Sequence, residues 1–281
     1  MRHFVGIETE NGSYEKSKVL LQSIPYDGTS TWGKGADRGY EAFMDALDNM
    51  EVYDIETASE VYLEGIHVLD ELKGFNSPEA MFEGVYGQVK DLIKTGKFIT
   101  CFGGEHSVSI GAIKAHYEHY DGLSILQLDA HTDLRPDFHG SAYNHACAVY
   151  DASKNTNLVQ VGIRSMDIEE MEHIQEGNIF WAHEMHGHRT WMQNSIDRLG
   201  DQVYITLDLD VFDPSVLPGT GTPEPGGLSW YDMVNYLRMV FEQKDVVGFD
   251  IVELAPINGH KASEFLTAKL YYKMLSYKFC L

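Results

Sequence analysis

Two short motifs carry side chains of the types that bind metal ions. Asp129, His131 and Asp133 are spaced two residues apart in the first motif, and Asp208 and Asp210 have the same spacing in the second. Alternate residues of an extended segment point to the same side, so each motif presents its polar groups on one face. Carboxylates that converge at the end of an apolar strand need a cation to stay ionised together. The spacing therefore indicates a metal site.

A third motif, Gly103-Gly104-Glu105-His106-Ser107, also follows an apolar run. Taken alone, His106 is more simply explained as a hydrogen-bonded turn residue, and an isolated Asp-x-Asp motif as a loop. All three motifs together, each behind a run that is expected to be buried, favour a metal centre. The candidate ligands are two imidazoles and four carboxylates: His106, Asp129, His131, Asp133, Asp208 and Asp210.

The donor set favours a particular class of metal. It contains no thiolate, because the three cysteines lie outside these motifs. Hard oxygen donors with some nitrogen favour Mn²⁺ over structural Zn²⁺, with iron or cobalt as alternatives. Six ligands exceed what one tetrahedral ion needs, and two bridging aspartates would suit a pair of ions about 3.5–4 Å apart. Such a pair makes hydroxide from water near neutral pH, a nucleophile for an unreactive carbon or phosphorus centre.

Alternating strands and helices must position these motifs. The expected strands are runs of mostly consecutive apolar residues: Val19–Ile24, Phe98–Phe102, Leu123–Leu128, Leu158–Ile163, Ile179–Ala182, Val203–Leu207 and Val246–Ile251. The expected helices are amphipathic: Ala36–Asp48, Pro78–Lys94, Val108–Tyr120, Asp167–Gln175, Trp191–Arg198, Ser229–Glu242 and Ala262–Tyr277. This alternation predicts a single α/β domain over residues 1–281, with a mostly parallel sheet in a three-layer α/β/α arrangement. Ligands of such sheets bind outside the carboxyl ends of the strands, where the motifs lie.

Composition narrows the class of partner. The chain has 281 residues and is 43% hydrophobic, which excludes wholesale disorder. A formal charge of −22 disfavours nucleic acid and anionic membranes as partners and favours a cationic ligand. The sequence has no apolar stretch approaching 18 residues, and its start has no apolar segment typical of a secretory signal. We therefore expect a cytoplasmic protein without a transmembrane helix.

The three motifs together resemble those of the ureohydrolases, the arginase/agmatinase family, and the resemblance extends from Pro25 to Pro256. It implies an arginase-like fold, two Mn²⁺ per chain and a trimer or hexamer. By motif position, one ion would be bound by His106, Asp129, Asp133 and Asp208. The other would be bound by Asp129, His131, Asp208 and Asp210, so that Asp129 and Asp208 bridge the two ions.

The same resemblance implies roles for three further residues. Glu253 matches the carboxylate that receives the guanidinium group of the substrate. His145, in Tyr143-Asn144-His145-Ala146-Cys147, matches the histidine that carries protons. Thr222, in the Gly-Thr-Pro-Glu-Pro-Gly-Gly run, matches a threonine that lines the guanidinium pocket.

Within the family, the sequence is most similar to agmatinases, which cleave agmatine to putrescine and urea in polyamine biosynthesis from arginine. The loop at residues 134–141 contains the agmatinase-like Phe-x-Gly-Ser form and lacks the Ser/Asn-rich loop of arginases. We expect Asp137 and Glu224 to meet the ammonium group of agmatine at the pocket rim. Ala148-Val149-Tyr150 departs from the agmatinase pattern, where a basic residue is usual, and so does Gly39-Tyr40, where Gly-Pro is usual.

Alternative substrates stay open at this point. A ureohydrolase acting on guanidinobutyrate, arginine or a related guanidino compound would need a cation for the substrate carboxylate, and Arg135 is the candidate. A solvated loop position is the simpler interpretation of Arg135. Zinc deacetylases share the fold but use a tandem histidine pair, which this sequence lacks. A non-catalytic binding protein is disfavoured by the complete ligand set, and we expect His183, His186 and His188 to lie in a surface loop.

Overall fold

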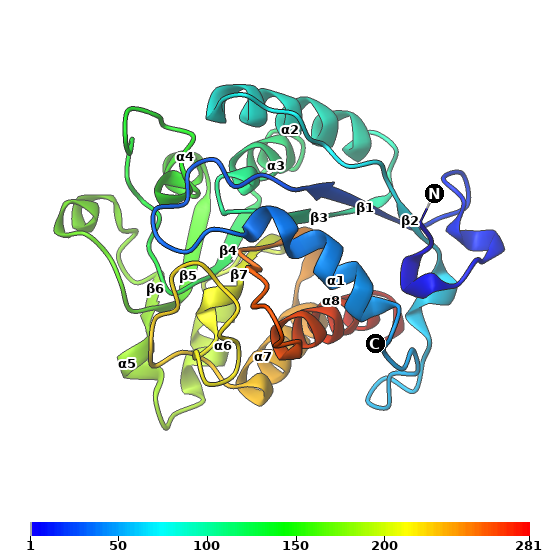
Figure 1. Ribbon diagram of the computed structural model, residues 1–281. Helices are drawn as coiled ribbons and strands as arrows, with labels where there is room; N and C mark the ends of the chain where they lie inside the picture. Colours follow the sequence, from blue (N-terminus) through cyan, green and yellow to red (C-terminus); the bar gives the residue numbers. More distant parts are fainter. Residues whose placement is uncertain (1) are drawn as a thin grey trace.

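Eight strands form one parallel sheet in the computed structural model, which describes residues 2–281 (Figure 1). In spatial order they are β2 (Ile66–Val68), β1 (Val19–Ile24), β3 (Phe98–Gly103), β8 (Asp245–Val252), β7 (Gln202–Asp208), β4 (Ser124–Leu128), β5 (Asn157–Ile163) and β6 (Ile179–Trp181). Every neighbouring pair is parallel. All six residues of β1 and of β3 are buried, as expected for strands that are covered on both faces.

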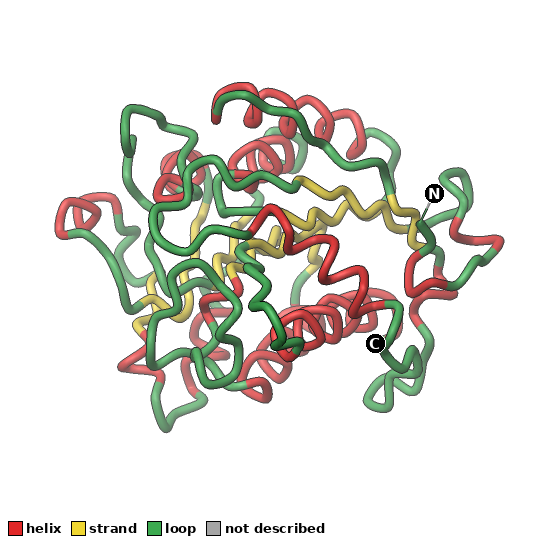
Figure 2. The backbone as a smooth tube through the Cα atoms, in the orientation of Figure 1, coloured by secondary structure: helices red, strands yellow, loops and turns green. Residues whose placement is uncertain are grey.

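Helices cover both faces of this sheet (Figures 1 and 2). The α-helices are α1 (Gly39–Leu47), α2 (Pro78–Ile93), α3 (Val108–Tyr117), α4 (Tyr150–Asn155), α5 (Ala182–Met185), α6 (Thr190–Ile196), α7 (Trp230–Gln243) and α8 (Ala262–Cys280). One apolar core contains side chains of α1, α6, α7 and α8, and the other contains side chains of α2 and α3 and Ala152 of α4. The predicted three-layer α/β/α domain is therefore confirmed, with a sheet that is parallel throughout.

The ends of several helices follow from local chemistry. Ser77 accepts a hydrogen bond from the Ala80 N–H and precedes Pro78, so α2 begins with a side-chain cap and a preset backbone angle. Ser229 caps α7 in the same way through the Asp232 N–H. Across residues 2–281, no helix combines the length and the apolar composition that a membrane span requires.

Four elements differ from the predictions, and one of them is the short helix α5, which lies where a strand end and a surface loop were expected. Strand β2 was not predicted, because it has only three residues and is formed through its pairing with β1. Helix α4 was not predicted either, and it has six residues. The segment predicted as an amphipathic helix at Asp167–Gln175 is a 3-10 helix, η6 (Ile168–His173), which begins with a capping box between Asp167 and Glu170.

The strand order has a direct consequence for the motifs. Strands β3, β8, β7 and β4 are consecutive in the sheet, although they are far apart in the sequence. Because all four are parallel, their carboxyl ends lie along one edge of the sheet. The three motifs and Glu253, which directly follows β8, therefore meet in space.

Candidate active site

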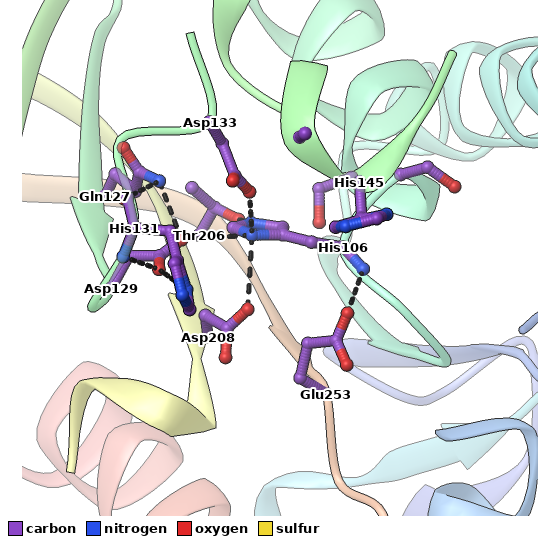
Figure 3. Close-up of polar contacts among 12 residues, drawn as sticks. His106, Gln127, Asp129, His131, Asp133, His145, Thr206, Asp208 and Glu253 are labelled. Carbon is purple, nitrogen blue, oxygen red and sulfur yellow. Dashed lines mark hydrogen bonds and ion pairs between the residues drawn. The ribbon is translucent and has the colours of Figure 1, made fainter. Parts of the chain in front are cut away.

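The six predicted metal ligands converge at the carboxyl ends of three strands, and Figure 3 labels all of them except Asp210. His106 follows β3, residues 129–133 follow β4, and residues 208–210 begin at the end of β7. His106 Nδ1 lies 3.0 Å from Asp133 Oδ2, 3.1 Å from Asp129 Oδ2 and 3.3 Å from Asp208 Oδ2.

These side chains form two groups. Ligand atoms of His106, Asp129 and Asp208 lie within 4.8 Å of one another, and so do those of Asp129, His131 and Asp210. In the second group, His131 Nδ1 is 2.9 Å from Asp210 Oδ2 and 3.7 Å from Asp129 Oδ1. Asp129 is shared by both groups, as a bridging ligand must be, whereas Asp208 belongs to the first group only.

The surroundings of His106 fit a cation. Thr206 donates its hydroxyl proton to Asp250 Oδ1 (2.7 Å), so it accepts a hydrogen bond from His106 Nε2 at 2.9 Å. Nε2 then carries the proton of the neutral ring, and Nδ1 presents a lone pair. That buried nitrogen forms no hydrogen bond within residues 2–281, although three carboxylates surround it. A lone pair that faces three carboxylates requires a positive ion between them.

Charge repulsion in the site supports the same conclusion. Burial and the nearby Asp210 and Asp129 raise the pKa of Asp208 well above its ordinary value. Burial alone would lower the pKa of His106, but the close carboxylates raise it well above its ordinary value. Protons on His106 and Asp208 thus offset the negative charge of the neighbouring carboxylates. A metal ion bound at this place would displace these protons.

A second layer of buried polar side chains orients these ligands. Gln127 donates to Asp129 Oδ2 at 2.7 Å and accepts from Gln160 Nε2 at 2.6 Å. Asp250 also accepts hydrogen bonds from Ser109 Oγ and Tyr204 OH. The sequence analysis assigned no role to Gln127, Thr206 or Asp250, although a polar residue inside an otherwise apolar strand is the signal that could have identified them.

Glu253 lies beside the ligand cluster in an uncommon backbone conformation. It follows β8 with φ of 67°, and its N–H donates to Gly104 O at 2.8 Å. Its Oε1 accepts from the His106 N–H at 2.9 Å (Figure 3). Burial and the nearby Glu105 raise the pKa of Glu253 well above its ordinary value. A non-glycine residue held in the left-handed region is strained, and such strain concentrates at functional sites.

His145 and Thr222 line the same cavity as the ligand cluster and Glu253, with a volume of about 250 Å³. His145 begins the 3-10 helix η5 (His145–Cys147), which Asn144 caps by accepting from the Ala146 N–H. Burial and the nearby His106 and His131 lower the pKa of His145 to about 4. The ring is therefore neutral at pH 7 and able to accept a proton.

Arg135 also lines this cavity, but its charge is compensated. Its Nη2 donates to Asp167 Oδ2 at 3.1 Å, and its Nε lies 3.9 Å from Glu170 Oε2. The guanidinium group stacks over the Phe138 ring, 4.5 Å from its centroid. The structure thus shows Arg135 as an ion-paired wall residue, which is neither the solvated charge nor the free cation that the sequence analysis considered.

Two predicted rim residues lie elsewhere. Asp137 is exposed and lines a neighbouring groove, while Phe138 lines the cavity, because the chain folds back through hydrogen bonds between Phe138 and Ser141. Among residues 2–281, Glu224 is not one of those that line the cavity. Its Oε1 lies 3.9 Å from Nε2 of His131, which does line the cavity. His183, His186 and His188 are exposed; His183 lies in α5, and the other two follow it in a loop.

The sequence is similar to those of known ureohydrolases. Residues 17–276 match the model of the arginase family. An N(1)-aminopropylagmatine ureohydrolase of Synechocystis sp. is 38% identical over 276 residues, which cover 94% of this chain and 90% of that protein. An agmatinase of Halalkalibacterium halodurans is 30% identical over 252 residues, covering 87% and 86% of the two chains.

Solved structures share the fold. The agmatine ureohydrolase of Thermoplasma volcanium superposes with a TM-score of 0.86 at 28% identity, covering 95% of this chain and 91% of that one. Family membership also accounts for the convergent His/Asp cluster, since the family is metal-dependent. The chain therefore belongs to the arginase family, and it is a ureohydrolase, a hydrolase that acts on guanidino C–N bonds.

Proposed function

We propose that this ureohydrolase removes urea from a linear guanidino-amine with the agmatine skeleton. The observation that carries the proposal is the placement of Glu253, whose carboxylate lines the same 250 Å³ cavity as the converging His/Asp cluster. A buried carboxylate with a raised pKa is stabilised in its charged form by a cation, and a guanidinium group is such a cation.

The proposed metal ligands are the six residues of the cluster. His106, Asp129, Asp133 and Asp208 would bind one Mn²⁺, and Asp129, His131, Asp208 and Asp210 the other. When bound, a pair of such ions lowers the pKa of water and supplies a nucleophile at neutral pH. The absence of thiolates among these ligands and the four carboxylates support Mn²⁺.

The remaining residues position the substrate and move protons. Glu253 Oε1 already accepts a hydrogen bond from the His106 N–H, so Oε2 is the oxygen that receives the guanidinium, and Thr222 lines the same cavity. The leaving amine needs a proton, and the neutral His145 in the same cavity is the group that takes up and returns one.

The ion pairing of Arg135 bears on the choice between substrates. Guanidinobutyrate and arginine would place a carboxylate in a cavity whose arginine is already paired with Asp167. Agmatine instead carries an ammonium group at its far end, which the acidic surroundings favour. Asp137 and Glu224, which the sequence predicted to meet that ammonium, do not line the cavity and would act only at longer range.

N(1)-aminopropylagmatine is a second candidate substrate. The relative named for this substrate is 38% identical to the chain, and the relative named agmatinase is 30% identical. The cavity shares Arg135, Asp167 and Glu170 with the neighbouring groove, which is also lined by Asp137, Glu169 and Glu172. An added aminopropyl group would carry its ammonium along this acidic groove.

The test is urea release from a panel of agmatine, N(1)-aminopropylagmatine, arginine and guanidinobutyrate after loading with Mn²⁺. We expect kcat/KM for the better of the two agmatine-type substrates to exceed that for arginine at least about 100-fold, because an unpaired buried carboxylate costs several kcal/mol. Glu253→Gln, which cannot balance the guanidinium charge, should lose activity on every substrate. Preference for arginine or guanidinobutyrate would overturn the substrate proposal.

We also propose a cytoplasmic homo-oligomer, a trimer or hexamer, by analogy with the family. Light scattering coupled to size-exclusion chromatography tests the assembly. A monomeric mass near 31.7 kDa would contradict it.

A further inference from the structure

A chain of hydrogen bonds joins the fully buried Glu105 to His145 through Thr29. The Thr29 hydroxyl lies 2.9 Å from Glu105 Oε1 and 3.1 Å from His145 Nδ1. The same hydroxyl accepts a hydrogen bond from the backbone N–H of His145 at 3.0 Å. Glu105 has no exposed surface, and neither Glu105 nor Thr29 was assigned a role from the sequence.

The partners of Glu105 define the direction of these hydrogen bonds. Its two oxygens accept from the backbone N–H groups of Thr29 (3.1 Å) and Ser107 (2.8 Å), which can only donate. The hydroxyl groups of Ser107 and Thr29 complete the set, each 2.9 Å from Oε1. Burial raises the pKa of Glu105, whereas the four hydrogen bonds that it accepts lower the pKa and favour the ionised form, which can only accept.

The proton count of Thr29 then determines the state of the His145 ring. A hydroxyl group has one proton to donate and two lone pairs with which to accept. Because the proton of Thr29 goes to Glu105, its oxygen accepts from both neighbours in His145, the backbone N–H and Nδ1. Nδ1 of the neutral ring must therefore carry the proton, which leaves the lone pair on Nε2.

We propose that Thr29 and Glu105 are positioning residues that hold neutral His145 in its Nδ1–H tautomer, with the Nε2 lone pair available to the cavity. This inference rests on the proposed function, in which His145 carries protons. His145 is partly exposed and lines the cavity beside the metal-ligand cluster (Figure 3). In the opposite tautomer, Nε2 would be unable to take up a proton, and turnover would suffer without any change in metal binding.

Thr29 also accepts a hydrogen bond from the His145 N–H at the start of η5. The experiment must separate this structural role from the effect of Thr29 on the His145 ring. Thr29→Val replaces the hydroxyl with a methyl group of similar size, and Thr29→Ser keeps the hydroxyl. Thr29→Ala removes the group without adding bulk, in case the valine variant folds poorly. Asn144→Ala is the matched structural control, because it removes the other cap of η5, on the Ala146 N–H, and does not touch the ring.

The first measurement is kinetic. We expect Thr29→Val and Thr29→Ala to lower kcat by about 10–100-fold, part of the usual contribution of general acid–base catalysis, with KM nearly unchanged and metal content normal. Thr29→Ser should retain the pH profile of the parent enzyme. In a His145→Ala background, Thr29→Val should cause no further loss, because Thr29 acts through the ring. An equal loss in both backgrounds would overturn the inference.

The second measurement does not depend on activity. Deuterium exchange at the C2 carbon of histidine, followed by mass spectrometry on the metal-loaded enzyme, gives the titration midpoint of His145. Without the Thr29 oxygen, the protonated ring loses the acceptor of its Nδ1–H, so the midpoint should fall by about one pKa unit in Thr29→Val and Thr29→Ala. It should remain in place in Thr29→Ser and Asn144→Ala.

The two measurements keep the two proposals distinguishable. If His145→Ala itself retains kcat within tenfold, the proton-carrying role of His145 fails, and a shifted midpoint in Thr29→Val would still support the hydrogen-bond assignment. An unshifted midpoint in both hydroxyl-deleting variants contradicts that assignment, whatever the kinetics show.

Discussion

Two equally buried histidines near the two ends of helix α3 have pKa values that are shifted in opposite directions. His106 lies just before the helix and His116 in its last turn, and each is about 1% exposed. Three carboxylates raise the pKa of His106 well above its ordinary value, against the effect of burial. Burial lowers the pKa of His116 to about 4, and its Nε2 has no hydrogen-bonding partner within residues 2–281. Burial favours the neutral form of both rings, and only the carboxylates around His106 reverse that preference.

Strand β7 runs past both histidines. Tyr204 packs against the His116 ring, with 4.3 Å between centroids, and two residues later Thr206 is hydrogen-bonded to His106. Strand β7 thus contacts a neutral histidine near its middle and a candidate metal ligand near its carboxyl end. This separation allows one strand to contribute both to the core and to a site for a cation.

The largest expected effect comes from removing a shared carboxylate at the charged end. Asp129→Asn should lose metal from both sites and abolish urea release, because Asp129 belongs to both ligand groups. His106→Ala and Asp210→Ala should each empty mainly one site. Elemental analysis of the purified variants gives the ion counts. Two ions per chain and normal turnover in Asp129→Asn would disprove its bridging role, and Glu83→Gln, an exposed change on α2, serves as the control.

The next effect concerns proton transfer in the cavity. His145→Ala should reduce kcat by roughly 10²–10⁴-fold, the usual contribution of general acid–base catalysis, while metal content stays normal. Added imidazole should restore part of the activity. A loss of less than about tenfold would mean that the ring only packs beside the site.

A smaller effect is expected from the second layer around His106. Thr206→Val removes the acceptor for His106 Nε2 and should weaken metal binding about 10–100-fold, as losses of outer-layer partners do. Tyr204→Phe is the matched control, since Tyr204 also donates to Asp250 but does not contact His106 through its hydroxyl. Titration calorimetry with Mn²⁺ measures both variants. Equal weakening in the two would show that Asp250, and not the orientation of His106, is responsible.

The smallest effect at neutral pH is expected for His116, in the last turn of helix α3, and it concerns the free energy of unfolding. The folded-state pKa of His116 is about 4, below the unfolded value near 6.5, so the unfolded state binds the proton first as the pH falls. His116 should therefore lower the free energy of unfolding by about 3 kcal/mol between pH 7 and pH 4. Urea denaturation of metal-free protein at both pH values measures this change.

The comparison protein for that measurement is His116→Phe, which has no titrating group at this position. It should show a correspondingly smaller loss over the same pH range, even if packing changes its stability at pH 7. The cluster carboxylates titrate in both proteins and cancel in the difference. An identical pH dependence would assign the acid sensitivity to groups other than His116.

Much of the candidate site could be predicted from the sequence because its signals are local. The period of two places Asp129, His131 and Asp133 together on any extended segment, and apolar runs of five or six residues identify the buried strands that precede the motifs. Residues 129–133 and 208–210 do lie at strand ends, with side chains of both segments within ligand distance of one another. The roles of Glu253, His145 and Thr222 came from the resemblance, and the cavity contains all three.

Other features depend on segments that are distant in the chain, and local patterns carry no information about them. Nothing near residue 29 indicates that its hydroxyl will meet Glu105 and His145, which lie 76 and 116 residues away. Gln127, Thr206 and Asp250 are polar residues in otherwise apolar strands, but only the pairing of β7 with β4 and β8 shows which partners they meet. The displacement of Asp137, in contrast, has a local cause, a turn at residues 138–141 next to the contact of Phe138 with Arg135.

The difference between the features that the sequence predicts and those that only the tertiary structure decides has a physical cause. The identity and spacing of side chains along a strand are properties of the chain itself, so the donor set and its preference for a hard metal ion could be stated before any folding was considered. Which strands become neighbours depends on how crossover helices pack over the sheet. The order β3-β8-β7-β4 is the outcome of that packing, and it alone brings residues from four distant segments to one edge. The protonation of His106 and His145 depends on the groups gathered there, since electrostatic interactions act through space over a few ångströms.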